Sequence, residues 1–140
     1  MIPVTSANER EWADLCIALW PETTALDILK DRANGKMPYE FLYFVDHDPV
    51  AFVSLSLRND YVEGTDSSPV GYLEGIYVKP NFRGRGIGRE MVDFARKWAA
   101  DHGCIQFASD CELDNEASRL FHGRLGFKEV NRCIFFVVDL

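Results

Sequence analysis

Hydrophobic and polar positions along the chain follow two different periods, and the order of the two predicts the fold class. Apolar residues recur at helical spacing in segments 10–19, 24–34, 87–102 and 115–124. Runs rich in β-branched and aromatic residues occupy 2–4, 39–45, 50–57, 73–78, 105–108, 127–130 and 133–138. This order, β-α-α-β-β-β-α-β-α-β-β, predicts a single α/β domain over residues 1–140, of the α+β type, with a mixed central sheet flanked by helices.

Local signals mark several of these boundaries. Ser6 and Glu9 have the spacing of a capping box at the start of the first helix, and Pro21 ends that helix. Residues 46–49, Asp-His-Asp-Pro, lie between two predicted strands, where turn chemistry accounts for the Asp and Pro residues. We therefore expect a hairpin turn there and no metal site.

A glycine-rich turn lies between the strand that ends near Val78 and the helix that follows. Its glycines stand at 84, 86 and 88, which fits neither the G-x-G-x-x-G pattern of dinucleotide folds nor a P-loop, because Arg89 replaces the P-loop lysine. A turn of this kind directs backbone N–H groups and the positive end of the helix dipole to one point. The sequence therefore predicts a phosphate-binding turn, with a solvated basic turn as the alternative.

Composition narrows the possible partners. The chain has 140 residues, 47% of them hydrophobic, and a net charge of −7. Nucleic-acid binding depends on positive charge, so no nucleic-acid partner is expected, whereas a cationic substrate would be attracted. Mild acidity also serves solubility alone, and charge by itself favours that simpler explanation.

Cellular location is suggested by what the sequence lacks. Residues 1–12 have no signal-peptide pattern, no segment approaches the roughly 18 apolar residues of a membrane span, and the four cysteines have no C-x-x-C spacing. We expect a cytoplasmic protein without a membrane partner, a disulfide or a metal.

Two motifs together resemble those of the GNAT superfamily of N-acetyltransferases. The first is R-x-x-G-x-G from Arg83 to Gly88, and the second is NEASRLFHGRLGF at residues 115–127, an asparagine leading a helix that ends in G-F. The segments SLRNDYVEGTDSSPV (residues 56–70), LEGIYV, ASD and LWP further resemble bacterial aminoglycoside 6′-N-acetyltransferases. The resemblance covers nearly the whole chain.

This resemblance implies acetyl-coenzyme A as co-substrate and assigns its contacts. The main-chain N–H of Ile76 would stabilise the negative charge that develops on the thioester oxygen. His122 stands where many relatives have a tyrosine that protonates the departing thiolate, so histidine either takes that role or is a structural residue. The implied coenzyme-binding residues are Ile76, Tyr77, Val78, Arg83, Gly84, Arg85, Gly86, Ile87, Gly88, Arg89, Asn115 and Ser118.

The acceptor amine requires carboxylates, and the sequence offers candidates. Glu74 is expected to act as general base, as ammonium ligand, or as both, and strand alternation places it on one face with Ile76 and Val78 unless a bulge intervenes. By resemblance, Asp110 binds a second ammonium group. Weaker substrate-binding candidates are Trp20, Asp60, Tyr61 and Glu112.

Three functions remain open from the sequence. The first is aminoglycoside 6′-N-acetylation, which implies antibiotic resistance; the second is acetylation of another amine, such as a polyamine or a protein N-terminus. The third, a non-enzymatic acyl-coenzyme A sensor, is disfavoured by the carboxylate pair Glu74 and Asp110. The relatives also suggest a homodimer.

Overall fold

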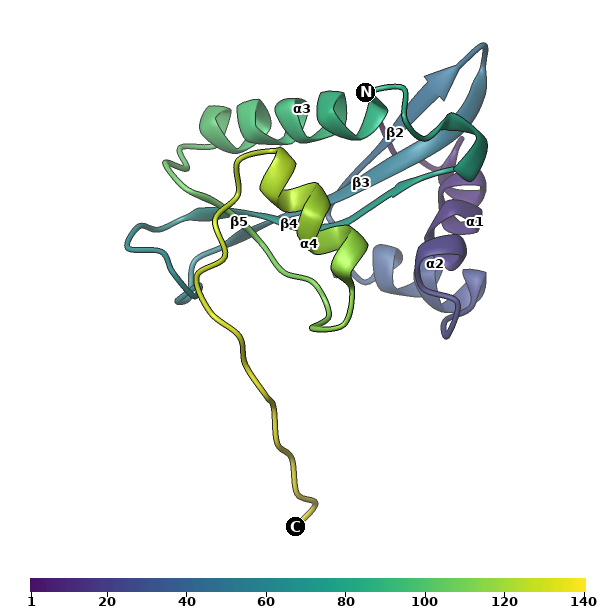
Figure 1. The fold of residues 1–140 in the computed structure, drawn as a ribbon. Coiled ribbons are helices and arrows are strands. Elements are labelled where there is room, and N and C mark those ends of the chain that lie inside the picture. The colour runs from purple at the N-terminus through teal and green to yellow at the C-terminus, as the bar shows by residue number, and fades with distance from the viewer.

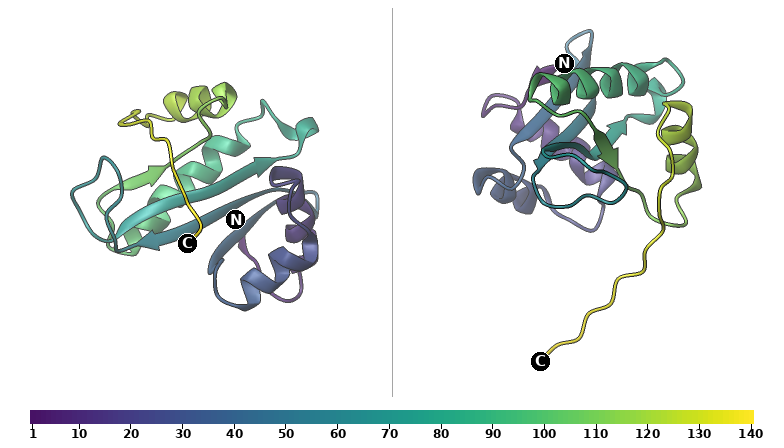
Figure 2. Two further views of the ribbon diagram at one scale, coloured as in Figure 1. Left: turned by 90° about the horizontal axis from the view of Figure 1, so that it is seen from below. Right: turned by 90° about the vertical axis from the view of Figure 1, so that its left-hand side faces the viewer.

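A five-stranded mixed sheet with the strand order β1-β2-β3-β4-β5 organises the computed structural model, which describes all 140 residues. The first four strands are antiparallel neighbours, and β5 runs parallel to β4. Figure 1 shows the arrangement, and Figure 2 gives two further views of it. The elements are β1 (Ile2–Pro3), α1 (Glu9–Leu19), α2 (Ala25–Ala33), β2 (Tyr39–Val45), β3 (Asp48–Arg58), β4 (Val70–Val78), a 3-10 turn (Pro80–Phe82), α3 (Ile87–Asp101), β5 (Phe107–Ser109) and α4 (Glu116–Arg124).

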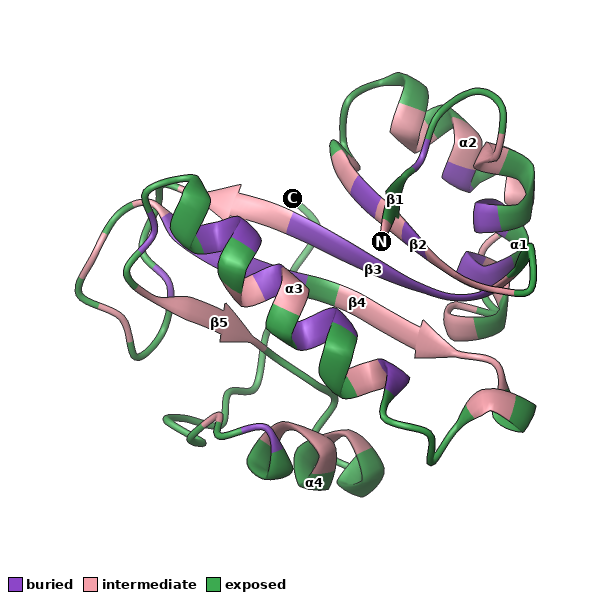
Figure 3. Ribbon diagram, turned by 90° about the horizontal axis from the view of Figure 1, so that it is seen from above, coloured by how far each residue is buried: buried purple, intermediate pink, exposed green.

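Alternation along β3 divides the core into two layers. Val53 and Leu55 face α3 and pack with Met91 and Val92, whereas Phe52 faces the other side and packs with Trp12 of α1. Burial is concentrated in β3 and on the inner face of α3, as Figure 3 shows. The sheet is thus covered by α3 on one face and by α1 and α2 on the other, as the hydrophobic periods predicted.

A β-bulge in β4 changes the direction of the residues that follow. Ser54 pairs with Gly75 and Leu55 pairs with Leu73, so Glu74 is the extra residue of β4. Ile76 and Val78 pack with the α3 layer, but Glu74 lies on the opposite face beside Ser56. The simple alternation that places Glu74 on one face with Ile76 and Val78 is therefore wrong, because the bulge intervenes.

Strands β4 and β5 are paired only briefly before they separate. Their register covers Gly71, Tyr72 and Leu73 against Phe107, Ala108 and Ser109, and no strand pairs with β4 beyond Leu73 on that side. The sheet therefore opens between the ends of β4 and β5, at the position where open α/β sheets bind ligands.

The two predicted C-terminal strands, 127–130 and 133–138, do not form in the single chain. After α4 the chain leaves the domain as an extended segment without strand pairing, and Figure 1 shows it running away from the sheet. Its apolar side chains, from Ile134 to Val138, are 77–95% exposed. The segment has a β-forming composition, but a strand also requires a hydrogen-bonded neighbour, and the sheet ends at β5 without pairing to it.

None of the helices is both long enough and apolar enough to cross a lipid bilayer.

Candidate active site

The glycine-rich turn presents a row of unpaired backbone donors. Gly84 and Gly86 adopt the left-handed conformation, with φ of 73° and 86°, which glycine reaches without steric cost. The N–H groups of residues 84–86 donate to no backbone carbonyl, and neither do those of residues 87–89 at the start of α3. A Cβ atom on Gly86 would meet nothing within 4 Å, so the donors face open space. This row of amides at the N-terminus of a 15-residue helix fits a pyrophosphate group.

The opening between β4 and β5 also offers main-chain groups. Lys79 N–H donates to Val50 C=O, and because hydrogen-bonded and non-hydrogen-bonded pairs alternate in an antiparallel ladder, Ile76 and Val78 point their N–H groups away from β3. These groups face the opening, whereas the main chain of Tyr77 faces β3. The exposed strand edge therefore suits an extended amide-containing chain such as the pantetheine arm of coenzyme A. Of the three strand residues that resemblance assigned to the coenzyme, Ile76 and Val78 fit through their backbones and Tyr77 does not.

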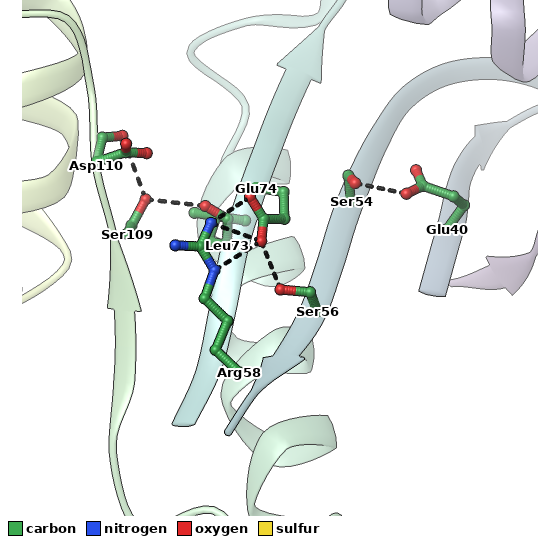
Figure 4. Close-up of polar contacts among 8 residues, drawn as sticks. All are labelled: Glu40, Ser54, Ser56, Arg58, Leu73, Glu74, Ser109 and Asp110. Carbon is green, nitrogen blue, oxygen red and sulfur yellow. Dashed lines mark hydrogen bonds and ion pairs between the residues drawn. The ribbon is translucent and has the colours of Figure 1, made fainter. Parts of the chain in front are cut away.

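Glu74, the bulged residue of β4, is held by two side chains from β3. Ser56 Oγ donates to Glu74 Oε1 at 2.5 Å, and the Arg58 guanidinium contacts both carboxylate oxygens of Glu74 at 2.8 Å. Figure 4 shows these two side chains meeting at Glu74. The carboxylate is thus fixed in place before any substrate binds.

A cleft of about 330 Å³ lies over this carboxylate. Trp20, at the C-terminal end of α1, packs its ring on Gly75, where a Cβ atom would come within 2.7 Å of the indole. The bulge and the glycine therefore bring the ring close to Glu74. The cleft is lined by Trp20, Lys36, Met37, Ser54, Leu55, Ser56 and Glu74.

A second carboxylate lies behind the cleft wall. Glu40 of β2 is buried and accepts hydrogen bonds from Trp12 Nε1 at 2.9 Å and from Ser54 Oγ at 2.5 Å. Burial raises the pKa of the Glu40 carboxyl to about 8, despite the two hydrogen bonds and Arg32, which lower it. Nearby Glu74 raises that pKa further. The two carboxylates therefore interact electrostatically through the cleft wall.

Asp110 follows β5 on the other side of Glu74, next to Tyr72. Burial, followed by the charge of Asp110, raises the pKa of the Tyr72 phenol, whereas Arg58 lowers it. The Arg58 guanidinium carbon lies 3.3 Å from the centroid of the Tyr72 ring. A connected group of charged and polar side chains thus extends from Glu74 through Arg58 and Tyr72 to Asp110.

His122 of α4 lies beside the separating strands. Its Nδ1 is 2.7 Å from the carbonyl oxygen of Ser118, which requires the proton on Nδ1 in the neutral ring, and its Nε2 is 2.8 Å from Ser109 Oγ. Ser109 Oγ is in turn 3.2 Å from the carbonyl oxygen of Leu73. The imidazole, packed between Phe121 and Phe127, is therefore connected through one hydroxyl group to the point where β4 and β5 separate.

The remaining predicted residues divide into two groups. Asn115 caps the start of α4 by accepting from the N–H of Ser118. At the other end of this helix, Arg89 of the coenzyme turn donates to the carbonyl oxygen of Arg124. Tyr61 is 76% exposed, and Asp60 and Glu112 are also exposed, so the structure does not bring these three into the cleft.

Sequence reasoning missed several residues of the cleft. The polar side chains Ser54, Ser56 and Arg58 recur at every second position of β3, a signal that their shared face is not simply core. Their partners Glu40 and Tyr72 lie on neighbouring strands and carry no local signal.

The sheet has an open edge with free amides, and a glycine-rich turn at a helix N-terminus lies next to it. This combination defines a class of enzymes that bind an acyl-coenzyme A between two diverging strands. The acetyltransferase (GNAT) family model matches residues 6–127, and the chain belongs to this family. It is an acetyl-coenzyme A-dependent N-acetyltransferase.

Named relatives are similar over nearly their whole lengths. Aminoglycoside N(6′)-acetyltransferase type 1 of Acinetobacter haemolyticus is 37% identical over 136 residues, which span 96% of this chain and 94% of the relative. The enzyme of the same name from Salmonella typhimurium is 42% identical over 128 residues, 89% of this chain and 88% of the relative.

Solved structures agree with the sequence relatives. The apo crystal structure of the A. haemolyticus enzyme AAC(6′)-IG superposes with a TM-score of 0.91 at 34% identity, covering 99% of this chain and 97% of that one. AAC(6′)-Iy in complex with the bisubstrate analogue CoA-S-monomethyl-acetylneamine gives 0.90 at 33% identity, covering 99% and 96%.

Proposed function

We propose that this enzyme transfers the acetyl group of acetyl-coenzyme A to the 6′-amine of an aminoglycoside antibiotic, by direct attack in a ternary complex, and so confers resistance to the drug. The observation that carries the proposal is the cleft that the Trp20 ring and the fixed carboxylate of Glu74 line together. An aromatic ring and a carboxylate together suit an amino sugar, whose ring packs on the indole while its amine contacts the acid. The names of the relatives point to the same substrate class.

Glu74 binds the acceptor amine and accepts its proton, directly or through a water molecule. Oε1 already accepts three contacts, from Ser56 and from two Arg58 nitrogens, whereas Oε2 accepts one. Oε2 is therefore the oxygen with capacity for the amine. Because an ammonium group has no lone pair, attack on the thioester requires this loss of a proton.

The coenzyme supplies the activated acetyl group, and the chain supplies the surroundings of its carbonyl. The N–H of Ile76 donates to the developing oxyanion, and the row of amides in residues 84–89 holds the pyrophosphate. When its ring carries protons on both nitrogens, His122 donates the Nε2 proton to Ser109 Oγ, and the Ser109 hydroxyl, which lies between the imidazole and β4, passes its own proton to the departing thiolate.

Recognition of the remaining ammonium groups is electrostatic. Asp110 provides one ligand beyond Tyr72, and the net charge of −7 favours the approach of a polycation. The exposed acids Glu112 and Asp60 add to this attraction through long-range charge.

The enzyme acts as a homodimer in which two chains exchange their C-terminal segments. Residues 133–138 are apolar, extended and exposed, and β5 leaves one edge of the sheet unpaired. The segment makes no strand pair with its own sheet, but a second copy presents an identical open edge, and exchange would pair both. The four cysteines are free, in keeping with a cytoplasmic protein.

The decisive experiment measures acetyl transfer to a panel of aminoglycosides, polyamines and peptide N-termini, followed by mass spectrometry and NMR to locate the acetylated nitrogen. We expect transfer to aminoglycosides at the 6′-nitrogen, and no transfer to an analogue with a 6′-hydroxyl group. Preferred acetylation of a polyamine or a peptide would instead identify a different acceptor.

A further inference from the structure

The carboxylate that should meet the cationic substrate is already paired with a cation of the protein itself. Arg58 Nε contacts Glu74 Oε1 at 3.0 Å, and one terminal nitrogen of Arg58 contacts both oxygens at 2.8 Å. This geometry is a bidentate pair, the strongest arrangement of a guanidinium and a carboxylate. A site that only attracted ammonium groups would leave its carboxylate free.

Arg58 is also fixed from the other side. Its guanidinium stacks on the Tyr72 ring at 3.3 Å, and the Tyr72 and Glu74 side chains project from the same strand. The Arg58 and Glu74 side chains remain 41% and 33% exposed, so the pair borders the cleft and is not sealed in the core. The positive charge is therefore held permanently next to the place of the reacting amine.

The pairing of Arg58 with Glu74 matters for the attack of the amine on the thioester. An unpaired carboxylate stabilises a bound ammonium ion and raises its pKa, which keeps the nucleophile in its unreactive form. A cation at contact distance from that carboxylate offsets this effect. The amine then binds beside a pair that is close to neutral.

We propose that Arg58 is a positioning residue that keeps the acceptor amine in its uncharged, nucleophilic form by neutralising Glu74, while Asp110 and the other acids hold the substrate's remaining ammonium groups. The inference deepens the proposed function and rests on it. The proton released by the amine passes through Glu74 Oε2 and a water molecule to the solvent at the open side of the cleft.

Other charged groups around the pair are accounted for. Lys36 lines the same cleft but its ammonium group pairs with Asp31 at 2.8 Å. Glu40 lies behind Ser54, and Asp110 lies beyond Tyr72. Of the basic side chains near Glu74, Arg58 is the one that contacts its carboxylate.

The test compares wild type with Arg58→Met and Arg58→Lys by single-turnover acetyl transfer at saturating acceptor, as a function of pH. The acid limb of this profile reports ionisation in the ternary complex. We expect Arg58→Met to move the limb upward by about one pH unit, because the uncompensated carboxylate now favours the ammonium form. The rate below the limb then falls about tenfold and recovers at high pH, and the acceptor KM does not rise. Arg58→Lys, which keeps the charge, retains the wild-type limb.

Two controls separate this role from a structural one. Lys97→Met removes a positive charge that is paired with Asp101 on the surface of α3, and it should leave the limb in place. Glu40→Gln removes the buried carboxyl whose pKa is raised to about 8. If this variant keeps the acid limb of the pH profile, the limb does not report the ionisation of Glu40.

The proposal is overturned if folded Arg58→Met keeps the wild-type acid limb and its rate is lowered equally at every pH. It is likewise overturned if a lowered melting temperature is the only change. Arg58 is then a packing residue. A wild-type enzyme that acetylates no aminoglycoside would instead contradict the proposed function. In that case the acid limbs of wild type and Arg58→Met are compared with whichever amine in the panel the enzyme accepts. A failure of the proposed function is thereby distinguished from a failure of the role proposed for Arg58.

Discussion

The coenzyme turn follows β4 and the acceptor cleft contains Glu74 of that strand, yet the two sites are built from different parts of the chain. The turn uses the main chain of contiguous residues 83–89, positioned by two left-handed glycines. The cleft uses side chains from the end of α1, from the segment after α2, from β3 and from β4. The first site therefore depends on backbone conformation and the second on charge, and substitutions should affect the two in separable ways.

The largest effect is expected at the turn. Gly86→Val places a β-branched residue at a φ of 86°, which costs on the order of 1–2 kcal/mol in strain, and directs its side chain into the space in front of the amides. We expect acetyl-coenzyme A binding to weaken at least about 100-fold, or roughly 2.7 kcal/mol, as measured by titration calorimetry.

Gly35→Val is the matched control for this change. Gly35 has a φ of 75°, also has no neighbour within 4 Å, and follows α2 far along the chain from the turn. Both variants should lose similar stability. Equal coenzyme affinity in the two would show that residues 84–89 do not bind the pyrophosphate.

The second effect concerns His122, which lies where the two sites meet. His122→Ala should lower the single-turnover rate by about 100-fold or less, since one proton donor typically contributes 10²–10⁴-fold and a thiolate leaves readily without help. His122→Tyr should restore part of the rate, and acetyl-coenzyme A affinity should stay close to that of wild type.

His102→Ala controls for the structural contribution of such a histidine. His102 Nδ1 contacts the carbonyl of Trp98 four residues earlier at 2.7 Å, as His122 Nδ1 contacts that of Ser118, but it lies at the end of α3. A fully active, stable His122→Ala would remove this residue from the proposed chemistry.

A smaller loss of affinity is expected at the acceptor site, where binding depends on charge. Asp110→Asn should weaken aminoglycoside binding about tenfold, equivalent to 1.4 kcal/mol, because a charge-assisted contact is lost. The difference from wild type should shrink as salt is added, since Asp110 is exposed. Asp101→Asn removes an equal charge from α3. If it weakened binding as much as Asp110→Asn does, then Asp110 would act only through the net charge.

The smallest effect on activity, and a distinct effect on stability, is expected for Glu40→Gln. Burial raises the pKa of Glu40 to about 8 in the folded protein, above its ordinary value of 4.5, so the folded state binds the proton more tightly than the unfolded chain. This contribution to stability is complete below about pH 4.5 and is lost as the pH rises toward 8. The free energy of unfolding of wild type should therefore decline over this range relative to Glu40→Gln, as measured by urea denaturation at several pH values. Parallel stability profiles for the two proteins would contradict the raised pKa.

The same comparison explains what the sequence could predict. The coenzyme turn was recognisable because glycine spacing between a strand and a helix is a local property. The contact of Arg58 with Glu74 was not, because it depends on the bulge at Glu74, and a bulge is set by pairing between strands distant in sequence. The prediction of strands in the C-terminal segment was wrong for a related reason. Its residues favour a strand, but strand formation depends on a neighbouring strand, and the single chain supplies none there.

The exposed C-terminal segment affects how the single chain behaves in solution. Cys-Ile-Phe-Phe-Val-Val, residues 133–138, is a six-residue run without charge, proline or glycine, and it combines β-branched and aromatic side chains. Such runs are prone to stack into fibrils when they are exposed. A single chain with this segment exposed is therefore open to aggregation, and to intermolecular disulfides through the exposed Cys133 when the protein is purified in air.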